Sequence, residues 1–145
     1  MKKLLFLAVL SIISCRDDND GSSSEVVGKW YVKESGIISG KDGSKLQWDE
    51  FSMCERKTSI EFTNDGRIIQ KVFTEKANGD CVEEPVENGS YTYDSNTKVL
   101  SGKIGSDNFT REVEKATKSE LNFILFKYDK DNDGHLDKYM QNYVR

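Results

Sequence analysis

An acidic segment near the end of the chain has the spacing of a calcium-binding loop. Its carboxylates fall at positions 1, 3, 5 and 9 of such a loop, where they can converge on one ion: Asp129, Asp131, Asp133 and Asp137. Gly134 at position 6 allows a sharp turn, and His135 at position 7 would offer its main-chain carbonyl. Position 12, normally a bidentate Glu, is Met140. The segment predicts either a weak calcium site or an ion-free turn rich in Asp and Gly.

Little else in the chain can perform catalysis. His135 is the only histidine, so Ser-His-Asp or Cys-His chemistry would have to use it, and a zinc site with several histidines is excluded. The neighbouring acids Glu83-Glu84 and Asp49-Glu50 are typical of solvated loops rather than of a general acid and base. We therefore predict that the protein is not an enzyme, and we expect no cofactor besides calcium.

The first fifteen residues have the organisation of an export signal. Lys2 and Lys3 precede an apolar run over residues 4–13, which is shorter than the roughly 20 residues that a membrane-spanning helix needs. Ser14-Cys15 then places a small residue directly before a cysteine. The segment resembles the bacterial lipoprotein signal, which implies removal of residues 1–14 and lipidation of Cys15. The alternative is an ordinary secretion signal with a chance cysteine.

Residues 15–25 are predicted to hold the lipidated cysteine and a flexible tether, because residues 16–25 contain no apolar side chain. The acidic cluster Asp17, Asp18 and Asp20 resembles the signal that sends lipoproteins of the Bacteroidetes to the outer face of the outer membrane. A solvated linker is the alternative. We expect a lipid-anchored protein of the bacterial outer membrane. The two alternatives leave undecided which face of that membrane carries the protein.

The length and net charge of the mature chain limit its number of domains and its possible partners. Removal of the signal leaves 145 − 14 = 131 residues, which suit one domain over residues 26–145. The loss of Lys2 and Lys3 changes the formal net charge from −4 to −6. An acidic domain without a cluster of Lys and Arg is a poor partner for nucleic acid. No feature of the sequence specifies a protein partner.

Two cysteines remain once Cys15 carries lipid, namely Cys54 and Cys81. An exported domain meets an oxidising environment, so we predict a disulfide between them. The closed loop would span 81 − 54 = 27 residues, and its closure entropy corresponds to roughly 3–4 kcal/mol of stability. Two free buried thiols are the alternative.

The rest of the chain is read as eight strands separated by turn residues such as Asn64-Asp65-Gly66. The predicted strands are Val26–Glu34, Thr58–Thr63, Arg67–Thr74, Val86–Tyr93, Lys98–Gly102, Asn108–Glu114, Leu121–Tyr128 and Lys138–Val144. Short connections favour an all-β, eight-stranded antiparallel up-and-down barrel over a two-sheet sandwich. The one long connection, residues 35–55, is apolar and is expected to fold over one barrel end.

Gly28-Lys29-Trp30 on the first strand resembles the Gly-x-Trp pattern of lipocalins. The resemblance implies that Trp30 closes one barrel end and that an arginine, Arg145 or else Arg111, covers its ring. Residues 26–145 as a whole resemble small lipocalin-like lipoproteins of the Bacteroidetes. This likeness is carried by Val27-Gly28-Lys29-Trp30, Cys54, Phe62-Thr63-Asn64-Asp65-Gly66, Cys81, Gly89-Ser90-Tyr91 and Tyr143-Val144-Arg145.

An eight-stranded barrel either encloses one small ligand or is filled by side chains. Apolar residues at predicted inward positions are candidates for ligand contact: Ile60, Phe62, Tyr91 and Phe109. The leading hypothesis is a lipid-anchored protein that binds or carries a small hydrophobic molecule. The alternative is a structural or interaction subunit of a surface complex, in which these residues are plain core.

Overall fold

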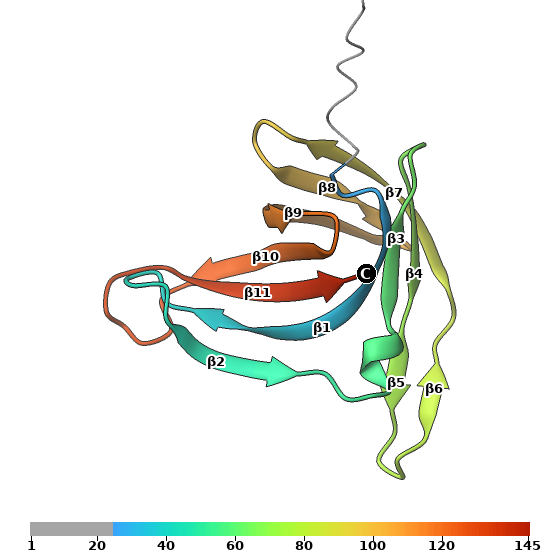
Figure 1. The fold of residues 1–145 in the computed structure, drawn as a ribbon, viewed down its shortest axis with the longest axis horizontal. Coiled ribbons are helices and arrows are strands. Elements are labelled where there is room, and N and C mark those ends of the chain that lie inside the picture. Colours follow the sequence, from blue (N-terminus) through green and yellow to red (C-terminus); the bar gives the residue numbers. More distant parts are fainter. Residues whose placement is uncertain (1–24) are drawn as a thin grey trace, which may run out of the picture.

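The computed structural model describes residues 25–145, which form an antiparallel β-barrel (Figure 1). The predicted signal at residues 1–14, Cys15 and nearly all of the tether lie outside the described residues. The elements are β1 (Gly28–Ile38), β2 (Lys45–Glu50), the 3-10 helix η1 (Glu55–Lys57), β3 (Ser59–Phe62), β4 (Arg67–Lys71), β5 (Phe73–Glu75), β6 (Cys81–Glu83), β7 (Glu87–Asp94), β8 (Val99–Ile104), β9 (Asp107–Ala116), β10 (Glu120–Tyr128) and β11 (Asp137–Val144). Within this range, no helix has the length and apolar character needed to span a bilayer.

The ring of the barrel runs through β1, β3, β4, β7, β8, β9, β10 and β11, and β11 pairs with β1 to close it. All of these pairings are antiparallel, and most join strands that follow each other in the chain. The predicted up-and-down barrel is therefore confirmed. Pairing of β11 with β1 closes the ring, and β9 and β10 pair only over residues 112–116 and 121–124.

The long connection after the first strand differs in part from the prediction, because residues 35–38 and 45–50 extend the sheet. Residues 35–38 continue β1, and β2 pairs with them so that Trp48 lies opposite Gly36. On its other edge, the same part of β1 pairs with β11, where Met140 lies opposite Gly36. A sheet of β2, β1, β11 and β10 therefore extends to one side of the molecule (Figure 1). Trp48 of the connection packs on this sheet, and its ring lies across Gly36, the one residue type that leaves room for it.

The densest part of the core lies where β1 begins. Side chains at alternate positions of the ring strands point inward there, as expected for a closed sheet. The largest that are fully buried are Trp30, Phe62, Ile68, Leu100, Leu121, Val26 and Val113. Phe62 meets Tyr91 edge to face, with ring centroids 5.0 Å apart. These residues fill one end of the barrel.

Glu25, which the sequence assigned to the tether, contacts the barrel. The Tyr93 hydroxyl donates a hydrogen bond to the Glu25 carboxylate over 3.2 Å. Burial of the phenol, together with this nearby negative charge, raises the pKa of Tyr93 to about 12. Tyr93 therefore stays a hydrogen-bond donor at neutral pH.

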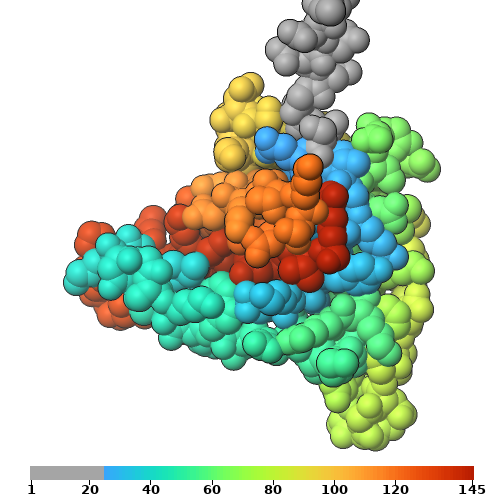
Figure 2. All heavy atoms as spheres, in the orientation of Figure 1, coloured from blue at the N-terminus to red at the C-terminus, as the bar shows by residue number. Residues whose placement is uncertain are grey.

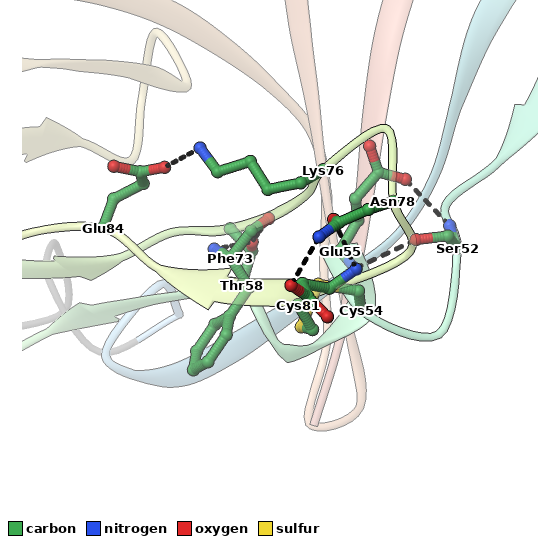
Figure 3. The surroundings of a disulfide bond; sticks show 10 residues. Ser52, Cys54, Glu55, Thr58, Phe73, Lys76, Asn78, Cys81 and Glu84 are labelled. Carbon is green, nitrogen blue, oxygen red and sulfur yellow. Dashed lines mark hydrogen bonds and ion pairs between the residues drawn. A yellow bond between two sulfur atoms is a disulfide. The ribbon is translucent and has the colours of Figure 1, made fainter.

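The segment predicted as one strand over residues 67–74 is divided into β4 and β5. β5 leaves the barrel and forms a hairpin with β6, with Glu75 opposite Cys81. This hairpin projects as the yellow-green tip in Figure 2. The predicted disulfide is confirmed: Cys54 and Cys81 are bonded, with their Cα atoms 5.4 Å apart (Figure 3). The disulfide therefore ties the projecting hairpin to the residue that precedes η1.

Candidate functional site

A cavity of about 380 Å³ lies in the barrel interior, and Trp30 is not among its lining residues. This volume falls within the range of roughly 300–1,000 Å³ that is typical of small-molecule sites. Apolar side chains make up half of its lining: Ile60, Phe62, Leu100, Ile104, Phe109, Phe123 and Leu125. The others are polar: Gln70, Glu87, Asp107, Asn108, Arg111, Gln141 and Tyr143.

Three of the four predicted ligand contacts line this cavity, namely Ile60, Phe62 and Phe109. The Phe109 ring lies against Gly102 of the neighbouring strand, where a Cβ atom would come within 2.9 Å of the Phe109 Cζ atom. Tyr91 is not among the lining residues. It is only 6% exposed, and its hydroxyl donates to the Thr63 carbonyl over 2.8 Å. Tyr91 therefore belongs to the packed core.

The polar lining residues were missed by the sequence reasoning, although strand alternation marks them. Arg111 stands between the inward residues Phe109 and Val113 on β9, and Gln70 is two residues beyond the buried Ile68 on β4. Their polar side chains did not indicate a place in the barrel interior, where apolar residues are expected. Gln141 likewise follows the inward alternation of β11.

Tyr143 of β11 lines this cavity. Its ring meets Phe123 edge to face at 5.6 Å, and its hydroxyl donates to Gln141 Oε1 over 3.0 Å. Burial raises the pKa of Tyr143 well above its ordinary value, and the positive charge of Arg111 offsets part of that rise. Tyr143 is therefore a neutral phenol at physiological pH, with a cation in its neighbourhood.

A second cavity of about 330 Å³ adjoins the first one. The two share the side chains of Gln70, Gln141 and Tyr143 as a common wall. The second is lined further by Val32 and by residues of the η1 and β5 region, among them Phe51, Glu55, Thr58 and Phe73. Two links hold the η1 and β5 side of this second cavity in place. Thr58 Oγ1 accepts a hydrogen bond from the Phe73 amide over 2.9 Å, and the Cys54–Cys81 disulfide lies nearby.

The closed end is built from Trp30, Arg145 and Gly28. The Arg145 guanidinium carbon lies 4.0 Å from the centroid of the Trp30 ring. Arg145 also donates to the Val27 carbonyl. Gly28 has a φ of +130°, and a Cβ atom there would lie 2.6 Å from Arg145 Nη2. The resemblance to lipocalins implied this contact for Arg145 first and Arg111 second, and Arg111 instead lines the cavity.

The acidic segment lies in the loop between β10 and β11. Asp129, Asp131 and Asp137 each place one carboxylate oxygen within 4.8 Å of the others. Asp133 and His135 are outside this group. Met140, at the position of the missing Glu, is buried in β11 and is no ligand. The carboxylates of three of the four predicted aspartates are thus brought together.

Main-chain amides already bind these carboxylates. Asp129 accepts hydrogen bonds from the amides of Asp133 and Gly134, over 3.1 and 2.9 Å. Asp137, which is 1% exposed, accepts the Gly40 amide over 2.9 Å and the Lys130 amide over 2.8 Å. Asp137 therefore joins the β1–β2 turn to the β10–β11 loop, which meet at one tip of the molecule (Figure 1). Calcium binding remains a prediction.

Residues 26–124 match the family model described as the lipocalin-like domain. The match covers more than half of the chain, and the chain therefore belongs to the lipocalin-like domain family. No curated protein shows significant similarity to the sequence. The narrower likeness to lipoproteins of the Bacteroidetes remains a prediction.

Two solved structures of low sequence identity are similar in part. The bovine lipocalin allergen Bos d 2 has a TM-score of 0.44 at 14% identity, covering 85% of this chain and 74% of that chain. A deswapped triple mutant of bovine odorant-binding protein has a TM-score of 0.39 at 13% identity, covering 84% and 74%.

Proposed function

We propose that the protein binds a small hydrophobic molecule inside its barrel and performs no catalysis. The observation that carries this proposal is the cavity of about 380 Å³, half of whose lining residues are apolar. In a barrel that served only as a structural subunit, side chains would fill this space, since protein interiors are close-packed. The second cavity behind Gln70, Gln141 and Tyr143 provides further room for a ligand that displaces these side chains.

A fluorescence titration tests this function. The mature chain with Cys15→Ser keeps every residue of the barrel and lacks only the attachment point of the lipid. We expect it to bind the neutral probe N-phenyl-1-naphthylamine, which fluoresces in apolar surroundings, at one saturable site. Cooperative thermal unfolding, followed by circular dichroism, establishes beforehand that the protein is folded.

A pair of variants locates the probe. Leu125→Trp adds volume to the cavity lining, and overpacking of this kind should weaken probe binding by about tenfold or more. Leu46→Trp makes the same change on β2, at a position 39% exposed and outside both cavities, and should leave binding unchanged. Absence of saturable binding, or equal binding by both variants, would support a filled structural barrel instead.

We further propose that the barrel is attached to the outer membrane through lipid on Cys15. The basis is the Lys2-Lys3 start, the short apolar run and the Ser14-Cys15 junction. The full-length Cys15→Ala variant should stay as unlipidated precursor or leave the membrane fraction. If it is processed and fractionates with membranes like the wild type, the anchor is not Cys15. Separately, protease treatment of intact cells that express the wild-type protein would show which face of the membrane carries the barrel.

A further inference from the structure

Arg111 is an arginine inside a barrel. On β9 it lies opposite Leu100 of β8, whose side chain is only 1% exposed in the core. Its neighbours Thr110 and Glu112 face outward: Thr110 meets Ser101 on the exposed surface, and Glu112 pairs with Lys127. Arg111 therefore directs its side chain inward, into the cavity described above.

No carboxylate within residues 25–145 comes within ion-pair distance of the Arg111 guanidinium. Its one hydrogen bond is donated to the neighbouring Thr110 carbonyl over 2.9 Å. Glu87 and Asp107 line the same cavity, but both are exposed at the strand ends, where water and salt screen their charges. A half-buried cation without an ion-pair partner is stabilised when an anion binds beside it.

Further hydrogen-bonding groups surround the guanidinium. Gln70 and Gln141 line the same cavity, and so does the neutral Tyr143 phenol. In the described part of the chain, the Gln70 side chain has no hydrogen-bond partner, and the Gln141 amide nitrogen donates to none. An anion beside Arg111 would thus find neutral donors from two other strands.

We propose that the ligand is an amphiphilic anion whose carboxylate, or a head group of similar charge and shape, binds Arg111 while its apolar body packs against Phe109, Phe123 and Leu125. This inference rests on the proposed ligand-binding function and names the chemical class of the ligand. The guanidinium presents parallel N–H groups that match the two oxygens of a carboxylate, so two charge-assisted hydrogen bonds would hold the pair. A neutral ligand of the same length would leave the cation unpartnered.

Displacement of the neutral probe by a matched pair of competitors tests the proposal. Decanoate and decan-1-ol share the chain length and differ in the charge of the head group. On the Cys15→Ser protein at neutral pH, decanoate should displace the probe at a concentration about 10–100-fold lower than decan-1-ol, the usual range for a hydrogen bond between charged groups. Equal potency of the two competitors would overturn the proposal without involving any variant of Arg111.

Arg111→Gln removes the charge but keeps a polar side chain. It should abolish the preference, so that decanoate and decan-1-ol displace the probe at similar concentrations. Lys103→Gln removes the same charge from the outer surface of neighbouring β8 and should retain the preference. If Arg111→Gln retains the preference, or Lys103→Gln loses it, Arg111 does not recognise the anion.

The two proposals fail in different ways. If the probe and decan-1-ol bind in the barrel but decanoate has no advantage, ligand binding stands and anion recognition is wrong. If neither the probe nor either competitor binds, the proposed function fails and this inference fails with it.

Discussion

The guanidinium of Arg145 lies over the Trp30 ring, 4.0 Å from its centroid, and so joins the residue after β11 to the start of β1. The Trp30 indole is fully buried and donates to the Val26 carbonyl over 2.7 Å, while Arg145 donates to the Val27 carbonyl. The contact therefore closes the barrel at the seam where β1 meets β11. Neither Trp30 nor Arg145 lines the cavity of about 380 Å³, so the contact stabilises the fold without blocking the lumen.

Trp30→Ala should destabilise the protein by about 3–5 kcal/mol, because it removes the largest side chain at the closed end and leaves a cavity. Arg145→Gln should cost less, about 0.5–2 kcal/mol, because the cation–π contact is lost while the indole stays buried. Urea unfolding followed by far-ultraviolet circular dichroism measures both. A Trp30→Ala loss below about 1 kcal/mol, the size usual at surfaces, would show that Trp30 does not close the barrel.

Reduction of the Cys54–Cys81 disulfide should lower the free energy of unfolding by about 2–4 kcal/mol, since the unfolded chain regains the entropy of its closed loop. Urea unfolding with and without reductant gives this difference. The Cys54→Ser, Cys81→Ser double variant is the matched control and should not respond to reductant. Alkylation of both thiols in denatured, unreduced wild-type protein would show that the bond does not form.

Asp137→Ala should destabilise the protein by about 1.5–3 kcal/mol, because two main-chain amides lose a buried carboxylate acceptor. Hydrogen exchange should accelerate at the amides of Gly40 and Lys130 and remain unchanged in the core of the ring. Asp131→Ala, at an exposed position of the same loop, serves as the comparison. Equal losses in the two variants would mean that Asp137 does not join the two turns.

Calcium should stabilise the β10–β11 loop slightly. Without the bidentate Glu, we expect a dissociation constant of about 10⁻⁴–10⁻³ M, which at millimolar calcium corresponds to about 1 kcal/mol. Thermal unfolding in calcium and in chelator measures this shift. Asp131→Asn should remove it, whereas Asp133→Asn, outside the group of three carboxylates, should retain it. The same shift in wild type and both variants would indicate nonspecific screening.

The sequence by itself determined the strands of the barrel ring and the residues at its closed end. Turn residues such as Asn64-Asp65-Gly66 and the alternation of polar and apolar side chains are local properties, and they indicate where strands begin and end. Within β3 and β4, the turn also determines the register, with Ile60 opposite Gln70. The pairing of Cys54 with Cys81 followed from there being no other partner once Cys15 is assigned to lipid.

Only the tertiary structure decided where residues 35–55 lie and what the lumen contains. The apolar side chains of this segment indicate burial but not against which surface, and pairing of β2 with β1 depends on the room that Gly36 leaves for Trp48. Whether the barrel is filled depends on how side chains from different strands meet in its interior. Arg111 and Gln141 enter one cavity because β9 and β11 both border β10 in the closed sheet, a neighbourhood that no local pattern specifies.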